Sequence, residues 1–169
     1  AKLWGFYSVC LDGVHVDLAR KLLEDSNTRV CAVVGFPTGA HLSSVKAFET
    51  ERIKELGAEE FDMVLNIGAL RNSDDESVLT DIEAVVSAAD PFPVKVILET
   101  CLLTDAEKRK ACDISIRAGA AFVKTSTGFS QGGATLDDVS LMKSTVGDSA
   151  QVKASGGIRS LKDANDFLD

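Results

Sequence analysis

Residues 61–67 read FDMVLNI, an apolar stretch with an aspartate near its start, and stretches of this kind decide the fold of the chain. Three others carry a lysine: VKVILE at 94–99, AFVKTS at 121–126 and QVKAS at 151–155. Short runs rich in β-branched and aromatic residues are typical of strands. An ordinary strand buried on both faces would exclude these charges, because Asp and Lys are seldom fully buried without partners. The four stretches therefore predict strands whose charged side chains share one environment.

The chain repeats a strand followed by a helix-length segment six times. Two further strands are predicted at 6–11 and 30–36, and the six starting points lie 24 to 33 residues apart. This order is the signature of a parallel sheet, because parallel strands need crossover connections. Thr104 and Glu107 form a capping box at the start of one helix, and Gly119 marks its end. Helices are predicted at 18–23, 45–56, 76–89, 104–119, 136–146 and 161–168.

Two architectures fit this order, an open doubly wound sheet and a closed barrel of alternating strands and helices. Side chains alternate along a strand, so Asp62, Lys95 and Lys124 each point to one face only. If these faces point inward, the lumen of a barrel gathers one carboxylate and several amines. We therefore favour an α/β fold of the TIM (β/α)8 type, here with about six βα units, as a single domain over residues 1–169.

The composition excludes several classes of partner. The 169 residues include 26 Asp or Glu and 18 Lys or Arg, a formal net charge of −8 with no basic tract. Proteins that bind nucleic acid are usually basic, so we expect no nucleic-acid partner. The apolar run at 30–39 is far shorter than the roughly 18 residues of a membrane span. The start of the chain does not have the pattern of a signal peptide. We expect a cytoplasmic protein without a membrane partner.

The four cysteines, at positions 10, 31, 101 and 112, form no C-x-x-C pair, and neither histidine lies near them at ligand-like spacing. We therefore expect no metal site. In an acidic chain without a secretory segment, cysteine usually stays reduced and packs as a small hydrophobic residue.

The charged strand residues together point to catalysis. Each charge alone is readily explained as a strand-end ion pair, and Lys95 fits that explanation best. A lysine that lies beside another cation and out of water loses its proton more easily, and the neutral amine attacks carbonyl carbon. The resulting iminium withdraws electrons and permits cleavage of a neighbouring C–C bond, while a carboxylate such as Asp62 transfers protons. The pattern predicts Schiff-base chemistry.

Glycine-rich turns follow two of the lysine strands, at 126–128 and 155–157. Backbone N–H groups at such turns bind anions, and phosphate is the expected ligand. Glycine also serves simply to make tight turns, which is why this signal is weaker. In GFPTG at 35–39 we predict a rigid loop without a chemical role. We assign substrate and phosphate binding to Thr125, Ser126, Gly128, Ser155, Gly156 and Gly157.

Several stretches together resemble the deoxyribose-phosphate aldolases, a family of class I aldolases on a TIM barrel. The resemblance runs in order along nearly the whole chain. It is carried by VVGFPTGAH (33–41), FDMVLNIGAL (61–70), VKVILETCLLT (94–104), AFVKTSTGFSQGGAT (121–135) and VKASGGIR (152–159).

The resemblance implies a reaction and a role for each residue of the centre. Members of this family cleave 2-deoxy-D-ribose 5-phosphate reversibly to D-glyceraldehyde 3-phosphate and acetaldehyde, a step of deoxyribonucleotide and carbohydrate catabolism that needs no metal or other cofactor. By this resemblance, Lys124 forms the Schiff base, Lys153 is the second lysine that favours its uncharged form, and Asp62 relays protons. Phosphorylated sugars and aldehydes are the expected partners.

Compared with the family pattern, the sequence starts at the second strand and stops in the helix after the seventh. Two of eight strands are therefore absent, with the closing loop that normally holds much of the phosphate. Six strands do not simply close an eight-stranded barrel. We expect self-association as a homo-oligomer, a rearranged closure or marginal stability, and weaker phosphate binding. Position 129 is Phe where some members have a phosphate-binding Lys.

Two other functions remain open from the sequence. One is a catalytically impaired barrel remnant that acts as an oligomerisation or partner-binding module. The other is a different Schiff-base lyase on the same scaffold.

Overall fold

Six parallel strands form one sheet in which each strand pairs with the next strand along the chain. The structure is a computed structural model and describes residues 1–168. All six predicted strands are confirmed, as β1 (Ser8–Leu11), β2 (Arg29–Val34), β3 (Glu60–Val64), β4 (Val94–Ile97), β5 (Phe122–Lys124) and β6 (Gln151–Lys153). A doubly wound sheet reverses its strand order at a switch point, and this sheet does not. The barrel-type order is therefore confirmed, as a curled half-barrel.

The predicted helices are present within a few residues of the expected positions. They are α1 (Val16–Leu22), α2 (Ser43–Glu55), α4 (Asp75–Ala89), α5 (Asp105–Arg117), α6 (Leu136–Val146) and α7 (Leu161–Asp166). Both reciprocal hydrogen bonds of the capping box between Thr104 and Glu107 are present at the start of α5. Gly119 follows the end of α5 with φ of +87°, a conformation that favours glycine. No helix within residues 1–168 is long and apolar enough to cross a membrane.

Four short helices were not predicted. They are α3 (Ile67–Arg71) and the 3₁₀ turns η1 (Lys2–Trp4), η2 (Gly13–His15) and η3 (Thr100–Leu102). Helices of three to five residues are too short to show a helical period in the sequence, so periodicity could not reveal them.

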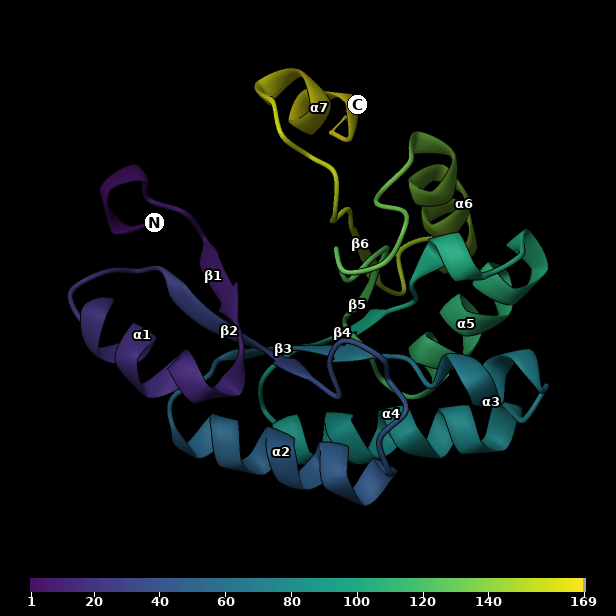
Figure 1. Cartoon of the computed structure of the whole chain (residues 1–169), viewed down its shortest axis with the longest axis horizontal. Coiled ribbons are helices and arrows are strands. Elements are labelled where there is room, and N and C mark those ends of the chain that lie inside the picture. The colour runs from purple at the N-terminus through teal and green to yellow at the C-terminus, as the bar shows by residue number, and fades with distance from the viewer. Residues whose placement is uncertain (169) are drawn as a thin grey trace.

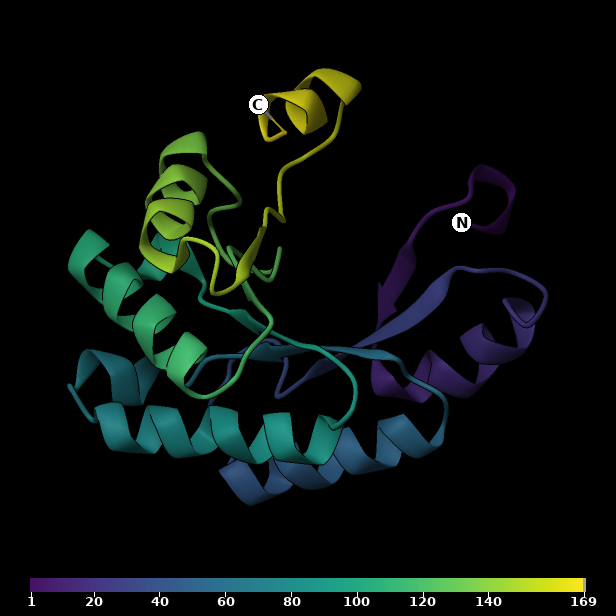
Figure 2. The same cartoon turned by 180° about the vertical axis from the view of Figure 1, so that it is seen from behind.

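The helices cover only the outer face of the curled sheet. Helices α2 and α4 lie side by side along this face, and α5 and α6 continue the layer (Figure 1). The N-terminal segment and α7 lie beyond the two edges of the sheet, on the side away from α2 and α4 (Figure 2). In the part of the chain that the structure describes, β1 and β6 each pair with one strand.

Alternation along the strands separates an apolar face from a polar one. Phe61 and Met63 of β3 are fully buried in the hydrophobic core cluster, which also contains Ile82 of α4. Asp62 lies between them in sequence and therefore points to the inner, concave face. The same alternation gives the inner face its charged side chains.

A buried ion pair links the helical layer to β3. Lys46 of α2 lies 2.6 Å from Asp81 of α4, and the two side chains are 0% and 1% exposed. The Lys46 ammonium also donates to the carbonyl oxygen of Val64, at the end of β3. Burial, which outweighs the attraction of Asp81, lowers the pKa of Lys46. The pair therefore fixes two helices at the end of the strand that carries Asp62.

Candidate active site

The sheet register brings the charged strand residues together on the inner face. Asp62 of β3 pairs with Lys95 of β4 in one row across the sheet. Lys124 of β5 pairs with Lys153 of β6 in the row two residues nearer the carboxyl ends of the strands. Active sites of TIM barrels lie at this end of the strands. Two rows of long lysine side chains can thus reach one carboxylate.

Asp62 is the centre of the cluster and is fully buried. Its Oδ2 atom accepts hydrogen bonds from the Nζ atoms of Lys124 at 2.8 Å and Lys153 at 2.7 Å. Its Oδ1 atom accepts one from Lys95 at 3.0 Å. The Lys124 side chain is 7% exposed, whereas that of Lys153 is 29% exposed. The structure therefore brings together the four charged residues singled out in the sequence.

The charges of the cluster stabilise one another. Burial would raise the pKa of Asp62, but Lys124, Lys153 and Lys95 together hold it well below its usual range. Burial would likewise lower the pKa of Lys153, yet the Asp62 carboxylate raises it above the ordinary lysine value. The lysines therefore favour the charged form of Asp62, and Asp62 favours the charged form of Lys153.

Lys95 is held deeper in the inner face than the other two lysines. Its ammonium donates to Glu60 at 2.8 Å as well as to Asp62. Although burial opposes its charge, Cys31, Asp62 and Glu60 raise the pKa of Lys95. Lys95 thus has the contacts of an ion-pair partner, as expected from the sequence.

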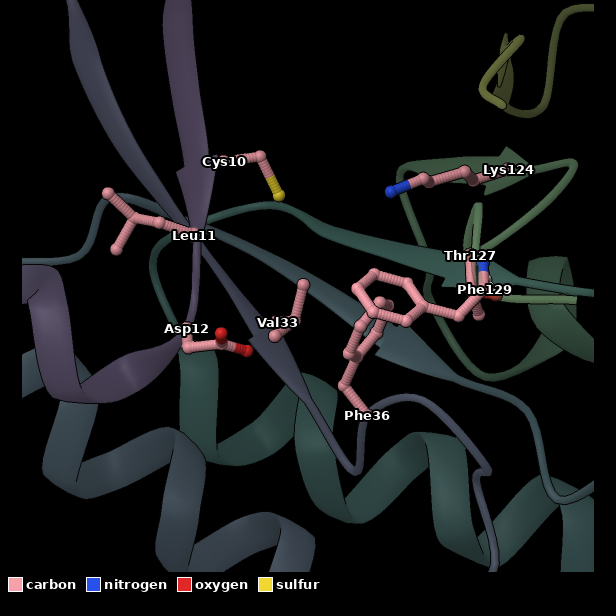
Figure 3. Close-up of a pocket in the computed structure, with 8 residues that line it drawn as sticks. All are labelled: Cys10, Leu11, Asp12, Val33, Phe36, Lys124, Thr127 and Phe129. Atoms are coloured by element: carbon pink, nitrogen blue, oxygen red, sulfur yellow. Dashed lines mark hydrogen bonds between the residues drawn. The ribbon is translucent and has the colours of Figure 1, made fainter. Parts of the chain in front are cut away.

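A cavity of about 350 Å³ lies in front of Lys124. Lys124 and Cys10 point into it from β5 and β1 (Figure 3). The rings of Phe36 and Phe129 meet edge to face at the cavity, with 5.2 Å between their centroids. The complete lining is Cys10, Leu11, Asp12, Val33, Phe36, Lys124, Thr127 and Phe129. The cavity gives a small carbonyl compound access to the amine of Lys124.

The two glycine-rich turns pack against each other beside this cavity. Gly128, Gly156 and Gly157 have φ of +84°, +83° and +82°, so a side chain at these positions would be strained. A Cβ atom on Gly156 would also meet Ser126 and Gly133 at 3.4 and 3.1 Å. Close backbone approach therefore requires glycine here, as expected for an anion-binding turn or a tight turn.

The hydroxyl groups near these turns differ in their contacts. Thr125 donates its hydroxyl hydrogen to the carbonyl oxygen of Ser155 at 3.0 Å and accepts from the Ser155 N–H at 3.0 Å. Ser155 in turn donates to the carbonyl oxygen of Ser126. The Ser126 hydroxyl is buried and has no protein partner within the described chain. The hydroxyls of Thr125 and Ser155 therefore hold the two turns together.

Glu99 is a site residue that the sequence reasoning did not single out. It follows β4 with φ of +56° and is 3% exposed. Its carboxylate accepts hydrogen bonds from the backbone N–H and the hydroxyl of Thr127. Glu99 thereby holds the turn after β5 next to Lys124. The signal in the sequence was its place on the same face as Lys95, four residues further along.

Two cysteines at the centre were also missed. Cys31 donates its thiol hydrogen to Asp62 Oδ1 at 3.1 Å, and the Cys10 sulfur lies 3.6 Å from Asp62 Oδ2. The prediction of cysteines packed as small hydrophobic residues holds for Cys112, whose pKa burial raises to about 12. Cys31 is fully buried as predicted, although it also contacts Asp62. The prediction of packing is wrong for Cys10 and Cys101, which are exposed.

The comparisons with known proteins agree on one family. The model of the DeoC/LacD family of aldolases matches residues 5–169. A deoxyribose-phosphate aldolase of Staphylococcus carnosus is 55% identical over 169 residues, which are all of this chain and 77% of that relative. One from Clostridium perfringens strain SM101 is 57% identical over 162 residues, 95% of this chain and 72% of that relative.

A solved structure of a deoxyribose phosphate aldolase is also similar to this chain. The tetrameric deoxyribose phosphate aldolase of Aeropyrum pernix superimposes with a TM-score of 0.91 at 35% identity. The match covers 99% of this chain and 71% of that one. The chain thus spans about three quarters of the length of its curated relatives.

Proposed function

Because the chain belongs to the DeoC/LacD family of aldolases, we propose that it cleaves 2-deoxy-D-ribose 5-phosphate reversibly to D-glyceraldehyde 3-phosphate and acetaldehyde. The observation that carries this proposal is the buried carboxylate of Asp62, which contacts both Lys124 and Lys153 through one oxygen atom. Two amines at one carboxylate, of which that of Lys124 lines a cavity, are suited to Schiff-base chemistry. The hypothesis of a catalytically impaired binding module is not favoured, since relatives 55% and 57% identical to this chain are named as deoxyribose-phosphate aldolases.

Lys124 is the proposed nucleophile because its amine faces the cavity. It must lose its proton to attack the aldehyde carbon C1 of the open-chain sugar. Lys153 stays charged beside it, and a neighbouring cation favours the uncharged form of an amine. Asp62 accepts a hydrogen bond from both nitrogens and can pass a proton between them and the carbinolamine. Loss of water then leaves the iminium between C1 and Lys124 Nζ.

The iminium makes the C–C bond cleavage possible. The hydroxyl on C3 loses its proton and the bond between C2 and C3 breaks, so that D-glyceraldehyde 3-phosphate leaves. The electron pair of this bond moves to C2 and forms an enamine on Lys124. Protonation at C2 and addition of water then release acetaldehyde and regenerate the amine. Asp62 is the acid–base group within reach of Lys124 for these proton transfers.

The phosphate is proposed to bind at the paired turns after β5 and β6. Backbone N–H groups of Gly128, Gly156 and Gly157 supply donors there, next to the Ser126 hydroxyl, which has no protein partner in the described residues. The Ser155 hydroxyl instead donates to the carbonyl oxygen of Ser126. Thr125 contributes by tying the two turns together through Ser155. The side chain of Phe129 presents no charge to the phosphate, so backbone groups are the proposed donors.

We also infer a homo-oligomeric state and a cytoplasmic location. One solved relative is described as a tetramer, and the sheet edges at β1 and β6 favour pairing with another chain. All four cysteines are unpaired in the structure, and free thiols persist in the reducing environment of the cytoplasm.

A turnover assay tests the proposed activity. The purified chain is incubated with 2-deoxyribose 5-phosphate, and release of D-glyceraldehyde 3-phosphate is followed with a coupled dehydrogenase. We expect turnover in the wild-type chain and in Lys143→Ala, an exposed control, and none in Lys124→Ala. Equal rates in Lys124→Ala and Lys143→Ala would exclude the mechanism. Cleavage of other hydroxyaldehydes but not of this sugar would indicate a different Schiff-base lyase.

A further inference from the structure

Cys10, Cys31 and Asp62 form a cluster of possible metal ligands on the inner face of β1, β2 and β3. Cys10 and Cys31 occupy paired positions on neighbouring strands, with both side chains directed to the same face. The two sulfurs and a carboxylate oxygen of Asp62 all lie within 4.8 Å of one another. The proposed aldolase reaction uses neither thiol.

The spacing of these atoms suits a small thiophilic cation. Zinc binds thiolate at about 2.3 Å and carboxylate oxygen at about 2.0–2.2 Å, so ligand atoms of a tetrahedral site lie roughly 3.5–3.8 Å apart. The distances from Asp62 oxygens to the sulfurs of Cys31 and Cys10 are 3.1 and 3.6 Å. Cys31 contacts Oδ1 and Cys10 contacts Oδ2, so binding of one cation requires the three side chains to converge on it. Cys10 also lines the cavity, which offers a path of entry and a water molecule as fourth ligand.

The charge balance at the site permits such a cation despite the surrounding lysines. Binding of one divalent cation to two thiolates releases two protons from the thiols, so the total charge near Asp62 does not change. Lys95 Nζ lies 3.6 Å from the Cys31 sulfur and donates to Asp62 Oδ1, so a cation bound to these two atoms would displace this ammonium. Lys124 and Lys153 keep hydrogen-bond access to the carboxylate oxygen that the metal does not use.

We propose that Cys10, Cys31 and Asp62 form a binding site for a thiophilic divalent cation of the zinc type. The sequence did not suggest it, because the three ligands come from three strands and have no motif spacing. The chemistry selects Zn²⁺ or Cd²⁺ over Mg²⁺ or Ca²⁺, which prefer all-oxygen ligands. Because Asp62 is also the proposed proton relay, a bound cation would compete with Schiff-base formation, an effect that rests on the proposed function.

Cadmium binding tests the site without reference to aldolase activity. The probe is Cd²⁺ added to the reduced chain, with the near-ultraviolet charge-transfer band of cadmium thiolate and the bound metal per chain as readouts. The reference protein is Cys101→Ser with Cys112→Ala, which retains only Cys10 and Cys31 and keeps the core position of residue 112 apolar. We expect one Cd²⁺ per chain with a thiolate band, and no such binding of Mg²⁺.

Two further variants assign the ligands. Replacing Cys10 by Ser in the reference protein removes a partly accessible ligand, so folding should be retained, and replacing Cys31 by Ser removes the buried one. Each should weaken Cd²⁺ binding on the order of 100-fold or more and abolish the two-thiolate band. Absence of a band in the reference protein, or an unchanged band and affinity in Cys10→Ser, would overturn the proposal.

Discussion

Asp62 accepts hydrogen bonds from all three of Lys95, Lys124 and Lys153, so its replacement tests the proton transfers directly. Asp62→Asn keeps the size of the side chain but removes the charge. We expect kcat for deoxyribose 5-phosphate cleavage to fall about 10²- to 10⁴-fold, the usual contribution of a positioned acid–base group. Circular dichroism checks the fold. Asp17→Asn, on the exposed face of α1, is the matched control. An unchanged kcat in folded Asp62→Asn would contradict the proposed role of Asp62 in proton transfer.

Lys153 provides a prediction about pH and stability. Its pKa is raised in the folded chain, so its ion pair with Asp62 contributes fully below the unfolded lysine value of about 10.5 and is lost as the pH rises through the folded value. The difference in unfolding free energy between the wild-type chain and Lys153→Met should therefore be constant between pH 6 and 9 and shrink at higher pH. Urea unfolding at several pH values measures it. A difference that grows above about pH 10.5 would contradict the assigned pairing.

The charged residues of the centre could be predicted from the sequence, but the two cysteines that contact Asp62 could not. Asp62, Lys124 and Lys153 interrupt apolar runs, which made each of them conspicuous. Cys10 and Cys31 look like ordinary strand residues, and only the register of β1, β2 and β3 shows that they meet Asp62. Register depends on packing of the whole sheet and is not written in any one stretch.

At the scale of elements, the pair of Lys46 and Asp81 joins α2 and α4 and reaches the end of β3. Removing one partner leaves a buried charge without compensation. We expect Lys46→Met or Asp81→Leu alone to lower the free energy of unfolding by about 3–5 kcal/mol, and the double variant to lower it by less. Urea unfolding measures all three.

An exposed pair serves as the matched control for this prediction. Lys21 and Asp17 lie on α1 at 2.6 Å with both side chains more than half exposed. Removing Lys21 should change the stability by less than about 1 kcal/mol. If Lys46→Met were no more destabilising than Lys21→Met, the buried pair of Lys46 and Asp81 would contribute no more to the free energy of unfolding than an exposed pair.

Strands and long helices could be predicted because their patterns are local. The starts of α5 and α6 follow threonine caps, and the apolar runs of the strands are bounded by turn residues. The five-residue α3 and the pair of Lys46 and Asp81 could not be predicted. The first is shorter than two helical turns, and the second joins residues 35 positions apart that resemble ordinary surface charges in sequence.

At the scale of the molecule, the proposed self-association concerns the two edge strands of the described residues. In the described residues, β1 and β6 have one neighbouring strand each, and Trp4 and Tyr7 beside β1 are 77% and 65% exposed. Unpaired edges with apolar side chains nearby favour contact with another chain. Light scattering after size-exclusion chromatography should give a mass of two or more chains, and Trp4→Glu with Tyr7→Glu should shift it toward one. A folded monomer at all concentrations would exclude this association.

The sequence predicts a barrel-type order of strands, but it does not predict how far the sheet curls toward a closed barrel. The strand order β1 to β6 follows from the repeat of strand and helix, whereas the degree of curling follows from side-chain packing between the sheet and its outer helices. The proposed chemistry depends on the amine of Lys124, which lies on the inner face of β5 in contact with Asp62.

Reductive trapping measures that amine directly. The folded chain is treated with acetaldehyde and sodium borohydride, digested, and examined by peptide mass spectrometry, with Lys124→Ala and Lys143→Ala treated in parallel. The account predicts one ethyl group on Lys124 in the wild-type chain and in Lys143→Ala, formed faster than on any surface lysine, and no such preferred adduct in Lys124→Ala. Uniform slow labelling of surface lysines, with Lys124 unmodified in folded protein, would contradict it.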